Sequence, residues 1–216
     1  MLDKQTLSIN LSINRRGAYI IKSNSKQASR TKHLLKKAFI EMVHKKGYSA
    51  VTVKDVVDFA QYNRTTFYVY YHNLDDLVEE LMHEMFEAIQ FYSLSKYKSN
   101  SRVKVQELTT NSFDLLYYIY DHRDYFSLLL VEDTLPRIHQ QFPEAFFNIL
   151  KSKFDIQYGV SFVDDHSQKR YMAYGTAGLI TDWIAQDFDV TPKEMTERLI
   201  RILKSFAQCF IIKELS

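Results

Sequence analysis

Five side chains between Arg64 and Tyr70 have the chemistry that contact with DNA requires. The guanidinium of an arginine can donate two parallel hydrogen bonds to guanine, and threonine can reach a phosphate or a thymine methyl group. Tyrosine hydroxyls at the ends of rigid rings suit phosphate contacts, and the amides at a helix N-terminus also bind phosphate. The hypothesis for this segment is a DNA-reading surface made of Arg64, Thr65, Thr66, Tyr68 and Tyr70.

Two short helices joined by a tight turn are predicted to position these side chains, over residues 52–71. Thr52 is a suitable N-cap for the first helix, whose inner face would carry Val53, Val56, Val57 and Ala60. Gln61 and Tyr62 would form the turn, and Asn63 would cap the second helix. This pattern predicts a helix-turn-helix, in which the second helix enters the major groove. An ordinary helical hairpin is the alternative.

Longer helices are predicted on both sides of this motif. Apolar residues recur at helical spacing over 26–46, and Gly47 is placed to end that helix. A second helix is predicted over 74–96, with Asp75 and Asp76 at the positive end of its dipole. A helix of that length would connect two bodies rigidly.

The charge of the chain divides sharply at the end of the motif. Residues 1–72 carry 13 Lys and Arg against 4 Asp and Glu, a net charge of +9, whereas the remainder carries −7. A basic N-terminal part followed by an acidic C-terminal part favours a nucleic-acid-binding module joined to another domain.

Composition indicates a folded, mostly helical protein. The chain has 216 residues, 46% of them hydrophobic, with only 5 Gly and 3 Pro. The single cysteine, Cys209, excludes an internal disulfide, and we expect it to be buried in a C-terminal helix. The 7 histidines do not cluster, so neither a metal site nor a cofactor is predicted. No apolar run reaches membrane-spanning length and no signal-peptide core is present, so a cytoplasmic location is expected.

The sequence predicts three parts. Residues 1–25 form a flexible basic arm; Leu7, Ile9, Leu11 and Ile13 alternate like a strand, but no second strand to pair with them is expected. Residues 26–92 form the DNA-binding domain. Residues 93–216 form a helical regulatory and dimerisation domain, with helices predicted at 103–121, 123–132, 135–153, 168–187 and 191–213 and a loop at 154–167.

Aromatic runs in the C-terminal part could line a small apolar pocket or simply fill the core. Plain core is the more common use of such runs, and the largest apolar pocket is where a ligand would bind. The candidate pocket residues are Tyr117, Tyr118, Phe126 and Phe146.

Residues 26–90 resemble the DNA-binding domain of the TetR family of transcription regulators. The resemblance rests on the helix from Arg30, on Gly47-Tyr48-Ser49, on Thr52-Val-Lys-Asp-Val-Val, and on Asn63-Arg-Thr-Thr-Phe-Tyr-Val-Tyr-Tyr-His-Asn-Leu. It implies an all-helical homodimer that binds a palindromic DNA operator. The DNA-binding residues it implies are Thr52, Asn63, Arg64, Thr65, Thr66, Tyr68, Tyr70 and His72. The family often has a lysine where this chain has Leu74, so one phosphate contact is expected to be missing or replaced.

The C-terminal half is more loosely similar to the TetR subgroup of dihydroxyacetone-kinase regulators, through residues 174–184 and 191–195. That resemblance implies a four-helix dimer interface made by the last two helices. The dimerisation residues it implies are Gly175, Gly178, Leu179, Trp183, Leu199 and Ile202. Close packing of helices within one chain is the alternative role for the two glycines.

The function expected from these features is transcription regulation. A repressor that responds to a small apolar ligand or a partner protein is the first hypothesis. The alternative is an activator, or an interaction module controlled by a partner protein. The sequence contains no convergent acid–base set, so no enzymatic activity is predicted.

Overall fold

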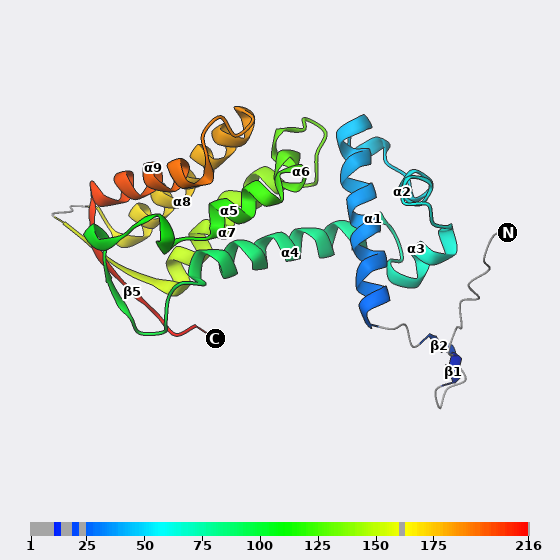
Figure 1. The fold of residues 1–216 in the computed structure, drawn as a ribbon, viewed down its shortest axis with the longest axis horizontal. Helices are drawn as coiled ribbons and strands as arrows, with labels where there is room; N and C mark the ends of the chain where they lie inside the picture. Colours follow the sequence, from blue (N-terminus) through cyan, green and yellow to red (C-terminus); the bar gives the residue numbers. More distant parts are fainter. Residues whose placement is uncertain (1–10, 14–18, 22–24, 160–162, 216) are drawn as a thin grey trace.

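The computed structural model describes residues 11–13, 19–21, 25–159 and 163–215. Figure 1 shows an elongated molecule in which one long helix joins two bodies. The smaller body contains α1 (Ser25–Lys46), α2 (Val53–Phe59) and α3 (Arg64–Tyr70). The long helix α4 (Leu74–Leu94) leaves this body beside α1 and forms part of the larger one.

Side-chain caps set the starts of the helices in the smaller body. Thr52, Asn63 and Asn73 each accept a hydrogen bond from the amide three residues further along, at the N-termini of α2, α3 and α4. These caps satisfy amides that no helical carbonyl can reach. Gly47 follows α1 with a φ of 79°, a left-handed conformation that glycine adopts without strain. The predicted caps and helices of this region are confirmed.

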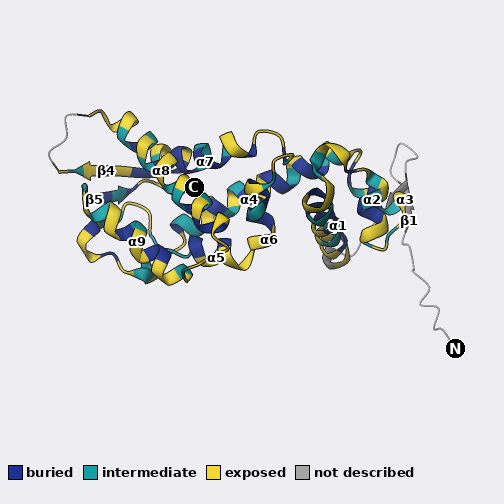
Figure 2. Ribbon diagram, turned by 90° about the horizontal axis from the view of Figure 1, so that it is seen from above, coloured by how far each residue is buried: buried dark blue, intermediate teal, exposed yellow. Residues whose placement is uncertain are grey.

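The larger body is a layered helical domain. Its helix α7 packs on α8 and α4, and α9 packs on α5. Figure 2 shows the buried residues on the faces where helices meet, with exposed residues on the outside. The helices are α5 (Leu115–Asp121), α6 (Arg123–Phe126), α7 (Ile138–Lys153), α8 (Asp165–Ala185) and α9 (Pro192–Lys204).

A small antiparallel sheet closes the far end of this body, and the sequence did not predict it. Its strands are β3 (Arg102–Lys104), β4 (Phe154–Tyr158) and β5 (Ala207–Ile212), in the order β3-β5-β4. The helix predicted over 103–121 therefore begins only at residue 115, the last helix ends at Lys204, and the loop predicted over 154–167 begins as a strand. Cys209 is buried as expected, but in β5 and not in a helix.

The expected all-helical fold is confirmed for the bulk of the chain, and the strands are its minor part. The statement that the N-terminal alternating segment has no partner strand is wrong, because β1 (Leu11–Ile13) pairs antiparallel with β2 (Tyr19–Ile21). Ile and Tyr favour such pairing. The predicted flexibility of residues 1–25 falls mostly outside the described residues. None of the helices that the structure describes could cross a membrane.

Candidate nucleic-acid interface

Helix α3 is anchored through one face. Phe67 is fully buried, and its ring lies 5.5 Å from the ring of Tyr71, which is 3% exposed. Val56 and Val57 of α2 belong to the same core. Because these apolar side chains fix the rotation of α3 about its axis, the residues on its opposite face point to solvent.

The opposite face of α3 presents the side chains that the sequence predicted for base reading. Arg64, Thr65 and Tyr68 are exposed, and Tyr68 retains 55% of its surface. Within the described part of the chain, the Arg64 guanidinium has no recorded hydrogen-bond or ion-pair partner. The five donors of this arginine are therefore available to a ligand outside the chain.

Two of the predicted DNA contacts have structural roles as caps. Thr52 forms a capping box with Asp55, and Asn63 Oδ1 accepts hydrogen bonds from Thr66 N and Thr66 Oγ1 at 2.8 and 2.9 Å. Hydrogen bonds from Lys46 and from Thr52 lower the pKa of Asp55, so this cap is charged at neutral pH. The side-chain amide of Asn63 keeps its donors, whereas the Thr66 hydroxyl is engaged within the helix.

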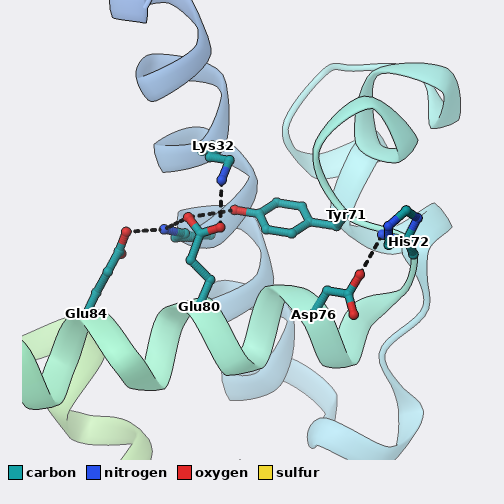
Figure 3. A network of polar contacts seen from close by, with 7 residues as sticks. Lys32, Tyr71, His72, Asp76, Glu80 and Glu84 are labelled. Carbon is teal, nitrogen blue, oxygen red and sulfur yellow. Dashed lines mark hydrogen bonds and ion pairs between the residues drawn. The ribbon is translucent and has the colours of Figure 1, made fainter. Parts of the chain in front are cut away.

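Tyr70 and His72 lie at the C-terminal end of α3. Tyr70 is half-buried and packs against the core, while His72 is exposed. The His72 backbone amide donates to Asp76 Oδ2 at 2.8 Å, which joins the end of α3 to the first turn of α4 (Figure 3). The structure thus places Tyr70 at the last residue of α3 and His72 just beyond it, with Tyr70 packed more closely against the core than the sequence indicated.

A charged network fixes the N-terminal half of α4 against α1. Lys36 Nζ lies 2.6 Å from Glu80 and 2.5 Å from Glu84, and Lys32 Nζ lies 2.6 Å from Glu80 (Figure 3). Tyr71 donates its hydroxyl to Glu80 at 3.4 Å. Burial, and secondarily the negative charges of Glu80 and Glu84, raise the pKa of Tyr71 well above its usual range.

This network limits how much of the basic front can attract DNA. Lys32 and Lys36 are neutralised by glutamates, and Lys46 is paired with Asp55 at 2.6 Å. Lys37 and Lys54 remain exposed. Because Glu80 and Glu84 lie beyond residue 72, the net charge of the first 72 residues overstates the positive charge that this surface offers.

The position where the family often has a lysine is apolar and flanked by acid. Leu74 is half-buried and packs against the core at the first residue of α4. The next residue, Asp75, accepts a hydrogen bond from the Tyr48 hydroxyl at 2.9 Å. Burial, and then this carboxylate, raise the pKa of Tyr48 to about 12, so its hydroxyl stays neutral. The first turn of α4 thus offers no cationic side chain.

A contact between the two bodies was missed by sequence reasoning. Tyr48 N donates to Asp133 O at 2.7 Å, and Ser49 donates to Asp133 Oδ2 from its amide at 3.0 Å and its hydroxyl at 2.5 Å. Nearby, the His44 ring Nε2 lies 2.9 Å from Asp124 O. Asp133 belongs to an irregular segment with no periodicity, so no local signal marks it.

The predicted dimerisation residues do not share one environment. Gly175 and Gly178 lie exposed on α8, and a Cβ atom added to either would meet no atom within 4 Å. Packing within the chain therefore does not require these glycines. Trp183, by contrast, is 1% exposed, and its indole N–H donates to Val190 O at 2.8 Å. The ring packs in the chain's own core, and a role of Trp183 in the dimer interface stays a prediction.

Three of the four predicted pocket residues are not among those that line the apolar cavity between α8 and α9. Phe126 is fully buried core, Tyr117 is 40% exposed, and Tyr118 stacks on Tyr92 with ring centroids 4.3 Å apart. Only Phe146 lines the apolar cavity of this body. A ligand-binding role for the other three positions stays a prediction, because an aromatic run along a helix cannot show which rings meet other helices.

The fold and the exposed face of α3 define a helix-turn-helix DNA-binding regulator. Comparison with known proteins agrees. Residues 35–81 match the family model described as bacterial regulatory proteins, tetR family, and residues 106–205 match a transcriptional regulator C-terminal region. The chain belongs to the TetR family of transcription regulators.

Several solved structures share this fold at low sequence identity. A TetR regulator from Streptococcus agalactiae 2603V is 19% identical, with a TM-score of 0.55 over 83% of this chain and 96% of that one. The dihydroxyacetone kinase operon activator DhaS is 18% identical, with a TM-score of 0.53 over 81% of this chain and 94% of that one.

A curated relative extends well beyond the matched region. The uncharacterized HTH-type transcriptional regulator YxbF of Bacillus subtilis (strain 168) is 18% identical over 166 residues. The match covers 76% of this chain and 42% of that relative, so this chain corresponds to less than half of its length.

Proposed function

We propose that this regulator acts in the cytoplasm as a homodimer, binds a palindromic operator and represses transcription until a ligand releases it. Each protomer would place α3 in a major groove, with Arg64 reading a base edge. Two reading heads joined by a symmetric interface match the two half-sites that helix-turn-helix dimers bind.

The observation that carries this proposal is that Arg64 is exposed and has no partner among the residues that the structure describes. Its helix is held rigidly by Phe67 and Tyr71, so the guanidinium is presented from a fixed base. Preorganised side chains lose less entropy on binding than mobile ones. The neighbouring Tyr68 supplies a hydroxyl on the same exposed face for a phosphate.

The test is binding of the variants Arg64→Ala and Tyr68→Ala to the DNA upstream of the protein's own gene, at fixed salt. A good bidentate arginine contact contributes about 1–3 kcal/mol, so Arg64→Ala should weaken specific binding by roughly 5- to 150-fold. Arg123→Ala is the matched control, because it removes an exposed arginine from the larger body. Equal affinities for Arg64→Ala, Arg123→Ala and the unchanged protein would place the reading surface elsewhere.

The glycines of α8 support the homodimer. Their open surroundings would let a second helix approach closely, and Gly175 lines the same apolar cavity as the partly exposed Leu199 and the exposed Ile202 of α9. Sedimentation of the unchanged protein and of Gly178→Leu measures the prediction. A monomeric unchanged protein at operator-binding concentrations would contradict it.

Activation is the second candidate, because one solved structure that shares the fold is that of an operon activator. A reporter gene joined to the protein's own promoter distinguishes activation from repression. Deletion of the regulator should raise expression if it represses and lower it if it activates.

A further inference from the structure

The outward face of α3 has a valine near its centre. Successive helical residues are about 100° apart around the axis, so Thr65 and Val69 each lie about 160° from the buried Phe67. Both are exposed, and Val69 retains 47% of its surface. Figures 1 and 2 show α3 on the side of α1 that faces away from the larger body. The part of α3 that projects furthest from the protein is therefore made by a threonine and a valine.

Neither packing nor helix formation accounts for a valine at this position. Nearly half of the Val69 side chain lies in water, whereas the next residue, Tyr70, packs against the core. Valine is also a poorer helix former than alanine, leucine or lysine. A single exposed apolar side chain is common on protein surfaces. This one, however, lies on the exposed face of the helix that also carries Arg64 and Tyr68.

The floor of the major groove offers a valine one kind of partner. Guanine, adenine and cytosine present hydrogen-bond donors and acceptors there, and thymine adds a C5-methyl group. Against that methyl group, the isopropyl group of Val69 would gain by burial. Against guanine or cytosine, the polar edge of the base would lose water and gain no hydrogen bond. The chemistry of Val69 therefore favours thymine.

The position of the Val69 side chain is fixed before DNA binds. Phe67 and Tyr71 hold α3 against the core, and a valine in a helix adopts one χ1 rotamer about 90% of the time. Thr65 lies four residues earlier on the same face, where its own methyl group can extend the apolar contact. Arg64 precedes Val69 by five residues, about 7.5 Å along the axis, which exceeds the rise of about 3.4 Å per base pair. The two side chains would therefore face different base pairs.

We propose that Val69 is a specificity-determining residue that packs on the C5-methyl group of a thymine in each half-site of the operator. The proposal deepens the proposed function and rests on it. Arg64 would read one base pair through hydrogen bonds, and Val69 would read another through its apolar contact.

The test measures binding to the DNA upstream of the protein's own gene, prepared either with thymine or with uracil in its place throughout. Uracil lacks only the C5-methyl group and keeps the hydrogen bonds of the base pair. Loss of one methyl contact in each of two half-sites should weaken binding by the unchanged protein roughly tenfold. In Val69→Ala, the same replacement should change the affinity by no more than about threefold.

Val163→Ala is the matched control. Val163 is 56% exposed in the larger body, and its substitution removes the same two carbon atoms from the protein. Alanine is a better helix former than valine, so Val69→Ala should leave α3 folded. Because each protein is measured on both DNAs, any effect of uracil on the flexibility of the DNA cancels when the proteins are compared.

The ratio of the affinities for thymine and uracil DNA is the decisive quantity. It should be reduced in Val69→Ala and unchanged in Val163→Ala. The same ratio in Val69→Ala as in the unchanged protein, or no effect of uracil on any of the three proteins, would overturn the thymine contact.

A scrambled DNA of the same length and composition separates this result from failure of the proposed function. If the unchanged protein binds the scrambled DNA as tightly as the upstream DNA, the proposed function fails and the thymine contact fails with it. If the protein prefers the upstream DNA but the ratios of all three proteins agree, only the thymine contact is refuted.

Discussion

The pair formed by Lys36 and Glu80 can be tested with a double-mutant cycle that uses Lys36→Met and Glu80→Gln. The two charged groups lie 2.6 Å apart, with side chains 9% and 29% exposed. Methionine keeps most of the apolar stem of lysine and removes its charge. Because the amino group is nearly sealed from water, removal of the carboxylate leaves a charge that water cannot fully solvate.

The expected effect lies between those of a buried and an exposed pair. Breaking a buried pair costs about 3–5 kcal/mol, and an exposed pair contributes about 0–1 kcal/mol. Glu80 retains Lys32 and Lys36 retains Glu84, so each substitution should lower the free energy of unfolding by about 2 kcal/mol. For a chain of this size, that corresponds to a decrease in Tm of about 4–8 °C.

The coupling free energy is the decisive quantity, and urea unfolding at neutral pH measures it. The double variant should be less destabilised than the sum of the single variants, by about 1–2 kcal/mol. Lys104 and Glu107 provide a matched pair, 3.0 Å apart but 71% and 67% exposed, whose coupling should stay near or below about 0.5 kcal/mol. A Lys36–Glu80 coupling no larger than this control would refute the reasoning.

The Lys36–Glu80 pair also predicts how the free energy of unfolding changes with pH. Burial alone would raise the pKa of Glu80, but hydrogen bonds from Lys32 and Lys36 outweigh burial and lower it below its ordinary value of 4.5. Stability from this carboxylate is therefore present above that value and is lost as pH falls through the lower, folded value. The difference in the free energy of unfolding between the unchanged protein and Glu80→Gln should shrink as pH falls below 4.5. A difference that stays constant with pH would count against a stabilising role of the Glu80 charge.

DNA binding gives an independent check on Lys36. A lysine that contacts phosphate releases a counterion, so its loss should reduce the slope of log affinity against log salt by about 0.9. Lys36 faces two glutamates, so Lys36→Met should leave this slope unchanged. A reduced slope would mean that Lys36 leaves the glutamates for the DNA backbone.

Three further predictions concern the helix-turn-helix and its contacts with the larger body and with DNA. Asn63→Ala should lower the free energy of unfolding by about 1 kcal/mol in urea, because the α3 cap is lost, and Asn63→Asp should retain most of it. Gly47→Ala should lower the free energy of unfolding by more than about 1 kcal/mol, because the φ of this residue is 79° and the added Cβ atom would lie 2.4 Å from Asp133 Oδ2. Combining it with Asp133→Ala should recover only the part of this loss that the steric clash causes. Leu74→Lys should steepen the salt slope of operator binding by about 0.9 if DNA phosphates pass the first turn of α4, and an unchanged slope would exclude them from it.

The helix-turn-helix could be predicted from sequence because its signals are local. A cap and the apolar residues that follow it lie within one or two helical turns, and Thr52, Asn63 and Asn73 each act on an amide three residues away. Such signals specify a helix start independently of the rest of the fold. The exposure of Arg64 followed in turn, because Phe67 and Tyr71 fix which face of α3 is buried.

The sheet could not be predicted because its stability depends on distant pairing. Residues 207–212 are apolar enough for either a helix or a strand, and periodicity cannot distinguish the two over so short a run. Strand β5 is specified by β3 and β4, which lie about a hundred and about fifty residues earlier in the chain. The burial of Trp183 was not predicted for a related reason: the family resemblance grouped it with the α8 glycines, but its indole contacts Val190 and Phe188, which lie beyond α8.

The predicted pocket shows the same limit. The sequence correctly marked the C-terminal part as aromatic-rich, but three of the four chosen residues pack elsewhere. The observed cavity depends instead on small residues, such as Thr176 and Thr196, that fail to fill a gap between helices. A gap of this kind depends on how two helices pack against each other, so the sequence of neither helix alone indicates it.

Among the described residues, the larger body is connected to the DNA-binding domain along α4 and through direct contacts of Asp133 and Asp124. One connection runs along α4, where Glu80 and Glu84 hold α1 and Tyr125 donates its hydroxyl to Leu81 O from α6. A second joins Ser49 directly to Asp133, and a third joins His44 of α1 to Asp124 O of α6. A change in the cavity could shift α3 only by altering at least one of these connections. Because Lys36→Met weakens the first and Asp133→Ala the second, comparing how each variant changes ligand-induced DNA release would show which of these two transmits the response.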